Sequence, residues 1–136
     1  MEIKSLKRIL DESKKPEPLL CIIDEVLRGT NTIERIAASS RILAALHQNW
    51  VIPFAATHDI ELSYILEDLY DNYHFEEEVK EKEVVFSYIL KKGRATSRNA
   101  IRLLDMLEYD LGIVEGAAKA ARDFEEKGVW ESLKPV

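Results

Sequence analysis

Two acidic residues, Asp24 and Glu25, directly follow the apolar run Leu19–Ile23. An Arg-Gly-Thr-Asn turn at residues 28–31 comes next, and a helical pattern then begins. A buried strand that ends in adjacent carboxylates is typical of sites that hydrolyse nucleotides. One acid can hold a magnesium ion, and the other can polarise the attacking water. The acid pair is a weak signal alone, because acids at strand ends often cap the following helix.

A second apolar segment, Val51–Ala56, ends in Thr57-His58, and the residues between the two segments have the apolar spacing of a helix. Strand, helix and strand at this spacing predict a βαβ unit with parallel strands and a right-handed crossover. Parallel strands end at the same edge of a sheet, so we expect Asp24, Glu25 and His58 to be neighbours. A lone histidine is more often structural, but one beside two acids is a candidate phosphate sensor.

The turn between the first strand and the helix strengthens this interpretation. Gly29 stands where the backbone must bend sharply. Asn31 can cap the following helix, which we expect to run to about Gln48, and Glu34 completes a capping-box pattern. Pro53 is unfavourable in a central strand and weighs against the second strand.

The other elements follow from periodicity and breakers. The run Leu19–Ile23 is uniformly apolar, which predicts a strand buried on both faces. Asp59 is expected to cap a short helix through Leu66. The alternation from Tyr73 to Leu90 predicts a hairpin that turns near residues 80–82, although no Gly or Asn stands there. Further helices are expected over residues 2–13, 97–108 and 111–127, and the last two form a helical hairpin.

Composition limits the class of protein. The chain has 136 residues, 32% of them charged and 46% hydrophobic, which is typical of a globular domain. A net charge of −6 argues against a broad DNA-binding face on this chain itself. The single cysteine, Cys21, excludes an internal disulfide. No signal-peptide or membrane-spanning pattern is present, so we expect a cytoplasmic location and no membrane partner.

Three segments, LLCIIDEVLRGTNTIER, PFAATHDIEL and GRATSRNAIRLLDMLEYDLGIVEGAAKAA, together resemble the C-terminal ATPase domain of the MutS family of DNA mismatch-repair proteins. The resemblance implies an α/β fold: part of a three-layer, ABC-type P-loop NTPase domain with parallel strands, an antiparallel hairpin and a C-terminal helical hairpin. It also implies that residues 1–95 belong to the ATPase domain and that residues 96–136 form a helix–turn–helix dimerisation tail.

The resemblance further implies a role for each site residue in the complete protein. Asp24 resembles the Walker B aspartate that holds Mg²⁺, and Glu25 resembles the general base. His58 is similar to the switch histidine that senses the γ-phosphate of ATP. The turn at residues 28–31 resembles a D-loop, which reaches the nucleotide of the partner subunit. Its residues are Arg28, Gly29, Thr30 and Asn31. The implied partners are a second copy, bound through the ATPase domain and the C-terminal helices, and DNA, bound by regions outside this chain.

Two departures from the family pattern matter. Commoner mismatch-repair members read DEIGRGT, whereas Leu27 precedes Arg28 here. The sequence also has no phosphate-binding loop of the form Gly-x-x-x-x-Gly-Lys followed by Ser or Thr. We therefore expect this chain to be the C-terminal part of a longer protein and to hydrolyse little ATP alone. Two alternatives stay open: a non-enzymatic dimerisation module, and another ABC-type DNA-associated ATPase such as the SMC class.

Overall fold

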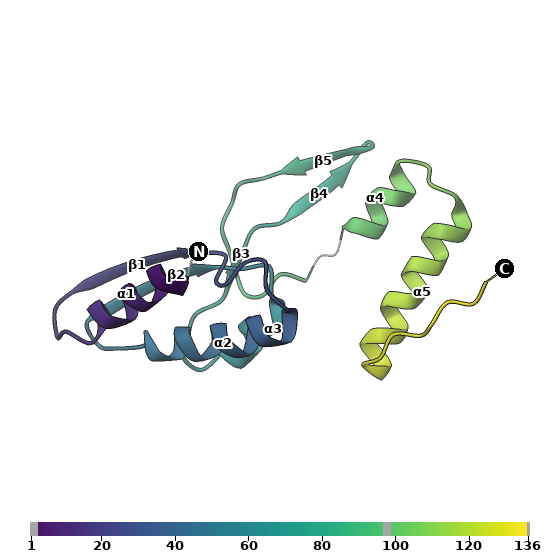
Figure 1. Ribbon diagram of the computed structural model, residues 1–136. Coiled ribbons are helices and arrows are strands. Elements are labelled where there is room, and N and C mark those ends of the chain that lie inside the picture. The colour runs from purple at the N-terminus through teal and green to yellow at the C-terminus, as the bar shows by residue number, and fades with distance from the viewer. Residues whose placement is uncertain (1–2, 97–98, 136) are drawn as a thin grey trace. The chain divides into compact units, whose positions relative to one another are not determined.

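The computed structural model describes residues 3–96 and 99–135 and shows a mixed α/β protein (Figure 1). Contacts divide the chain into two units. The first contains the described residues up to His74 together with Lys92–Arg94, and the second contains Phe75–Lys91 and the described residues from Ala95 onward. The elements in chain order are α1 Ile3–Ser13, β1 Leu19–Asp24, α2 Thr32–Ala45, β2 Val51–Ala56, α3 Ile60–Ile65, β3 Tyr73–His74, β4 Glu77–Lys80, β5 Glu83–Phe86, β6 Lys91–Lys92, α4 Ala100–Met106 and α5 Leu111–Lys127.

The first unit is built on the parallel pair β1 and β2, joined through helix α2. The pairing runs in continuous register from Leu19 opposite Val51 to Asp24 opposite Ala56, which confirms the predicted βαβ unit. Pro53 lies opposite Cys21 within β2. A proline fits here because β2 pairs only with β1 among the described strands, so its other edge needs no N–H donor. Both strands end at one edge of the sheet.

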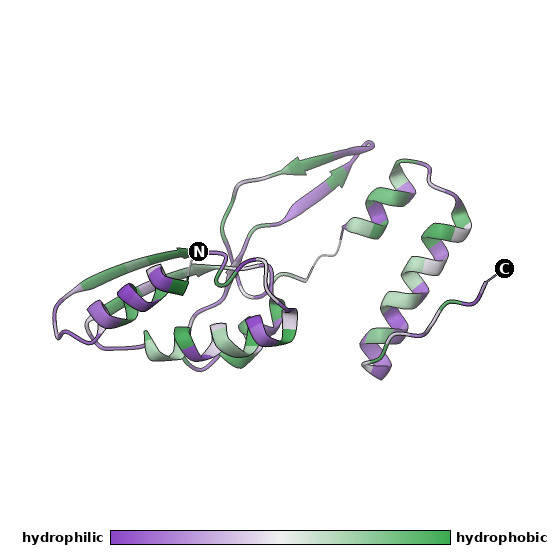
Figure 2. Ribbon diagram, in the orientation of Figure 1, coloured by the Kyte–Doolittle hydropathy of each residue, from purple (hydrophilic) through white to green (hydrophobic). Residues whose placement is uncertain are grey.

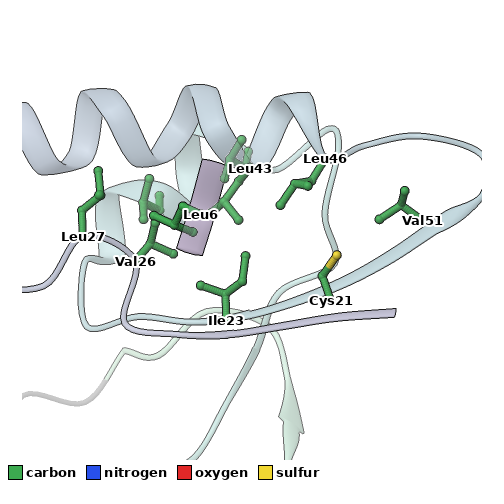
Figure 3. Packing of buried hydrophobic residues seen from close by; sticks show 10 residues of the cluster. Leu6, Cys21, Ile23, Val26, Leu27, Leu43, Leu46 and Val51 are labelled. Atoms are coloured by element: carbon green, nitrogen blue, oxygen red, sulfur yellow. The ribbon is translucent and has the colours of Figure 1, made fainter. Parts of the chain in front are cut away.

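Helices α1, α2 and α3 all pack on the same face of this strand pair. Figure 3 shows the resulting core, in which Ile23 of β1 lies among leucines of the helices. The buried hydrophobic residues are Leu6, Cys21, Ile23, Val26, Leu27, Leu43, Leu46, Val51, Leu62 and Leu66. Along β1, the buried residues Cys21 and Ile23 alternate with exposed residues, since every second side chain of a strand points to the same face.

The opposite face of the strand pair is apolar and exposed. Leu20 and Ile22 of β1 are 61% and 70% exposed, and Ile52 and Phe54 of β2 are 62% and 61% exposed. Figure 2 shows the hydrophobic character of β1 along its length. The prediction of a strand buried on both faces is therefore wrong for the described residues. The first unit forms two layers rather than the expected three, because none of its described helices covers this face.

Polar contacts fix the helices of the first unit. The indole Nε1 of Trp50 donates to the carbonyl of Ser13 at 2.8 Å, which joins the end of α1 to the start of β2. The hydroxyl of Tyr70 donates to the carbonyl of Leu43 at 2.6 Å, in the last turn of α2, where carbonyl groups run out of helical donors. Helix α2 ends at Ala45, a few residues before the predicted Gln48.

The second unit contains the antiparallel hairpin β4–β5 and the helical hairpin α4–α5. The β-turn lies at Glu81 and Lys82, whose φ angles of 47° and 63° match a type I′ turn formed without Gly or Asn. The turn position is confirmed, but the paired strands are shorter than predicted. Tyr73–His74 pairs with Lys91–Lys92 instead of extending the hairpin.

The terminal helices confirm the predicted helical hairpin. Helix α5 has the predicted bounds, with Asp110 accepting a hydrogen bond from the Gly112 amide at its start and Gly128 in the left-handed conformation at its end. Helix α4 begins at Ala100, and the start predicted near Ser97 lies outside the described residues. Phe124 and Trp130 stack with ring centroids 4.2 Å apart, which holds the segment after α5 against that helix. The predicted boundary between domains at residues 95 and 96 stays a prediction.

No helix in the described ranges 3–96 and 99–135 combines the length and the hydropathy that crossing a membrane requires.

Candidate active site

A tight turn follows β1 and carries the predicted site residues. Glu25, Leu27 and Gly29 have φ angles of 52°, 53° and 86°, so the backbone enters the left-handed region at every second position. Val26 and Leu27 insert into the core and are 3% and 9% exposed. Their burial anchors the turn and leaves Glu25 and Arg28 on its outer side. The positive φ of Gly29 confirms the sharp bend predicted there.

The Glu25 carboxylate lies at the centre of the site. One of its oxygens, Oε1, is 3.1 Å from Nε2 of His58, and the other, Oε2, is 3.2 Å from Nε of Arg28. The amide of Glu25 also donates to the carbonyl of Ala56 at 2.8 Å, which extends the β1–β2 pairing by one contact. The prediction that Glu25 and His58 are neighbours at the sheet edge is confirmed.

These contacts at Glu25 are weakly held. The side chain of Glu25 is 30% exposed, whereas those of Arg28 and His58 are 78% and 91% exposed. Each contact joins Glu25 to a side chain that is largely open to water, and exposed ion pairs contribute little to stability, with a median of ~0–1 kcal/mol. Both partners can therefore exchange Glu25 for another charged group without a large loss of folding free energy.

Asp24 is the last residue of β1 and is exposed at the same edge. Among the described residues, no group of three or more His, Cys, Asp or Glu side chains is arranged to hold a metal ion. Mg²⁺ usually needs only one or two protein carboxylates, with water and substrate phosphates completing its shell. An exposed carboxylate next to Glu25 fits that requirement, and Asp24 is the residue that would hold the ion.

Leu27 occupies the position where the commoner family pattern DEIGRGT has glycine. Its φ of 53° shows why glycine suits this position, because a left-handed conformation costs an L-residue about 1–2 kcal/mol. Burial of a leucine side chain contributes about 1.5–3 kcal/mol. Packing in the core therefore offsets the backbone strain, and the departure in sequence leaves the turn intact.

Helix α2 begins directly after the turn. The side chain of Asn31 accepts hydrogen bonds from the amides of Ile33 and Glu34 at 3.0 and 3.2 Å. Asn31 is thus the predicted N-cap. Thr30 donates from its hydroxyl to the carbonyl of Leu27 at 3.1 Å, so both residues serve the local fold of the turn.

Arg35 of α2 and Asp59 form a two-pronged ion pair that no sequence pattern predicted. Arg35 Nε donates to Asp59 Oδ2 at 2.8 Å, and Arg35 Nη2 donates to Asp59 Oδ1 at 2.6 Å. Asp59 stands at the N-cap position of α3, but its side chain makes no cap hydrogen bond, so the predicted capping role is wrong. The hydrogen bond from Arg35 lowers the pKa of Asp59. No spacing signal reveals this pair, because its members lie on different elements far apart in the sequence.

The geometry defines a class of site: two parallel strands of a mixed α/β protein bring an exposed aspartate, a central glutamate and a histidine to one sheet edge. The family model described as MutS domain V matches residues 1–125. The chain therefore belongs to the MutS family.

Three relatives of similar sequence are named as DNA mismatch repair proteins. The chain is 33% identical over 136 residues to the DNA mismatch repair protein MutS of Aquifex pyrophilus, an alignment that covers 97% of this chain and 16% of that protein. It is 32% identical over 128 residues to the DNA mismatch repair protein MSH3 of Eremothecium gossypii, covering 88% and 12%. It is 26% identical over 117 residues to the DNA mismatch repair protein MutS of Thermus caldophilus, covering 86% and 14%. The chain thus spans less than a fifth of the length of these relatives.

Proposed function

We propose that the protein containing this chain is a MutS-like, DNA-associated ATPase, and that this chain supplies the magnesium- and water-binding half of its site. The contact of Glu25 with His58 at the end of two parallel strands carries the proposal. Segments outside the chain would supply the phosphate-binding loop and the rest of an ABC-type P-loop NTPase fold. The 136 residues alone are then expected to hydrolyse ATP negligibly.

Each residue has a chemical task in this proposal. Asp24 would hold Mg²⁺, whose charge would stabilise the phosphate oxygens of ATP. Glu25 accepts a proton from the water that attacks the γ-phosphate, acting as general base. His58 Nε2, which lies 3.1 Å from Glu25 Oε1 in this structure, donates a hydrogen bond to the terminal phosphate when ATP is bound. Exchange of the Glu25 contact for the phosphate makes His58 a sensor of the γ-phosphate.

The proposal includes a homodimer, in which the exposed turn after β1 contacts the partner subunit. Arg28 is 78% exposed beside Glu25, and a guanidinium is well suited to bind phosphate oxygens. In the dimer, Arg28 and the adjoining Gly29, Thr30 and Asn31 reach the nucleotide of the partner subunit. The α4–α5 hairpin of each copy packs on the other copy. DNA is bound by regions outside this chain, in agreement with its net charge of −6.

The experiment compares Glu25→Gln with the unaltered full-length protein. Loss of a general base lowers turnover about 10²–10⁴-fold, while ATP binding is retained because the amide keeps the size of the side chain. Single-turnover hydrolysis and equilibrium binding of a fluorescent ATP analogue give the two quantities. Glu34→Gln is the matched control, since Glu34 is exposed in the first turn of α2, outside the site. Unchanged turnover in Glu25→Gln contradicts the proposal.

A second candidate function is a non-enzymatic dimerisation module. It is favoured by exposed apolar side chains along the helical hairpin, where Leu107, Leu111 and Ile113 are 65%, 63% and 55% exposed. In that case the acids at the sheet edge have no catalytic task. Asp24→Asn in the full-length protein separates the two candidates, because unchanged ATP turnover supports the module and loss of turnover supports the ATPase.

A further inference from the structure

Arg35 joins the two loops that meet at Glu25. Its Nη1 donates to the carbonyl of Thr30 at 3.3 Å, in the turn that carries Arg28. Its Nε and Nη2 bind both oxygens of Asp59, which directly follows His58. One side chain on α2 is therefore bonded to the segments that present both partners of the Glu25 carboxylate.

This bridge is more shielded from water than the contacts at Glu25. The side chains of Arg35 and Asp59 are only 21% and 14% exposed, in contrast with the 91% exposure of His58. A guanidinium that binds both oxygens of a carboxylate fixes distance and orientation together, which a lysine ammonium cannot do. Asp59 is also oriented by its own loop, because its amide donates to the hydroxyl of Thr57 at 3.0 Å.

We propose that Arg35 and Asp59 are positioning residues that hold His58 at Glu25 and keep the Arg28 turn in register with it. The pair does not touch the reacting atoms. It sets the separation of the two loops, so that an exposed imidazole occupies one place instead of many. The catalytic meaning of this arrangement rests on the ATPase function proposed above, but the positioning itself is a property of the chain alone.

The first test measures positioning without ATP. In the 136-residue chain, the His58 Hε1 resonance is distinguished from those of His47 and His74 by a His58→Ala variant. Glu25→Gln is then introduced into the unaltered chain and into an Arg35→Lys chain. We expect the His58 shift caused by Glu25→Gln to be at least about twofold smaller in the Arg35→Lys background, because the two groups no longer stay together. Equal shifts in both backgrounds overturn the proposal.

The controls separate positioning from folding. Arg41→Lys is the matched variant, since Arg41 is an exposed arginine on the same helix, and it should leave the His58 shift as in the unaltered chain. Far-ultraviolet circular dichroism checks that Arg35→Lys is folded. If it is not, Asp59→Asn replaces it, because the amide keeps the size of the side chain while losing one acceptor. An undiminished His58 shift in a folded Asp59→Asn chain likewise overturns the proposal.

The second test uses the full-length protein. Arg35→Lys should lower kcat for ATP about tenfold and leave KM within about twofold, because the substitution displaces the switch and base without removing a ligand of ATP. Arg41→Lys should change neither. If Glu25→Gln abolishes turnover while Arg35→Lys retains full kcat, the positioning role fails and the ATPase proposal stands. If Glu25→Gln is itself without effect, the ATPase proposal fails, and the resonance measurement alone decides the positioning.

Discussion

Two adjacent isoleucines of β1 test whether the core lies on only one face of the β1–β2 strand pair. Ile23 is 1% exposed and packs under the helices, whereas Ile22 is 70% exposed on the bare face of the strand pair. Truncation of isoleucine to alanine removes about three carbon atoms, worth about 2.4 kcal/mol when fully buried. With the cavity that remains, Ile23→Ala should lower the free energy of unfolding by about 2–5 kcal/mol. Ile22→Ala loses less than a third of that transfer term, about 0.7 kcal/mol.

Urea unfolding of the 136-residue chain measures the difference. Trp50 reports on the first unit, because its indole is bonded to the carbonyl of Ser13, and a Trp130→Phe background removes the other tryptophan. With a slope of about 2 kcal/mol per molar urea, the midpoint should fall by about 1–2.5 M for Ile23→Ala and by about 0.4 M for Ile22→Ala. Equal midpoint shifts would refute the assignment of the two faces.

The same pair of variants in the full-length protein tests the proposed remainder of the domain. Parallel sheets are normally covered on both faces, so the upstream segments of a P-loop domain should bury Ile22. Ile22→Ala should then become about as destabilising as Ile23→Ala, at about 2–5 kcal/mol. A shift that stays small in the longer protein would contradict the proposal that the exposed face is covered there.

Three further predictions concern single contacts of the first unit. Asn31→Ala removes both cap bonds of α2 and should cost about 1 kcal/mol in urea unfolding. Burial raises the pKa of Tyr70 to about 12, so the stabilisation from its neutral hydroxyl is complete below pH 10 and is lost as pH rises toward 12. Tyr70→Phe should remove the ionisation step of Tyr70 from an ultraviolet titration, and it should cost about 0.5–1.5 kcal/mol through the lost bond to Leu43. The hydrogen bond from Arg35 lowers the pKa of Asp59. The stabilisation from ionised Asp59 is therefore complete above the unfolded pKa near 3.8, and it is lost as the pH falls through the lower folded pKa. Asp59→Asn should remove this loss of stability at acid pH, which urea unfolding at a series of pH values measures.

The local elements and the pairing of β1 with β2 could be predicted from the sequence. Apolar periodicity located the strand and helix segments, and Asn31 marked the start of α2. The parallel direction of the two strands in a βαβ unit then placed Glu25 and His58 at one edge, where they are 3.1 Å apart. These inferences succeed because they depend on short-range sterics and on a topological rule that few proteins break.

Other features were decided only by the tertiary structure. Asp59 could cap α3 or bind a cation, and the sequence favoured the cap. The fold placed Arg35 within 2.8 Å, and a charged, two-pronged bond is stronger than a bond to a backbone amide. The conformation of Leu27 was similarly hidden, since only its burial in the core compensates for a left-handed leucine.

One physical reason separates the features that the sequence determined from those that only the tertiary structure decided. The sequence by itself determined which residues the chain brings to the end of β1, because strand and helix periods act within a few residues. The tertiary structure decided which face of β1 is covered and which groups hold His58 in place, because burial and ion pairing depend on distances between segments far apart in the chain.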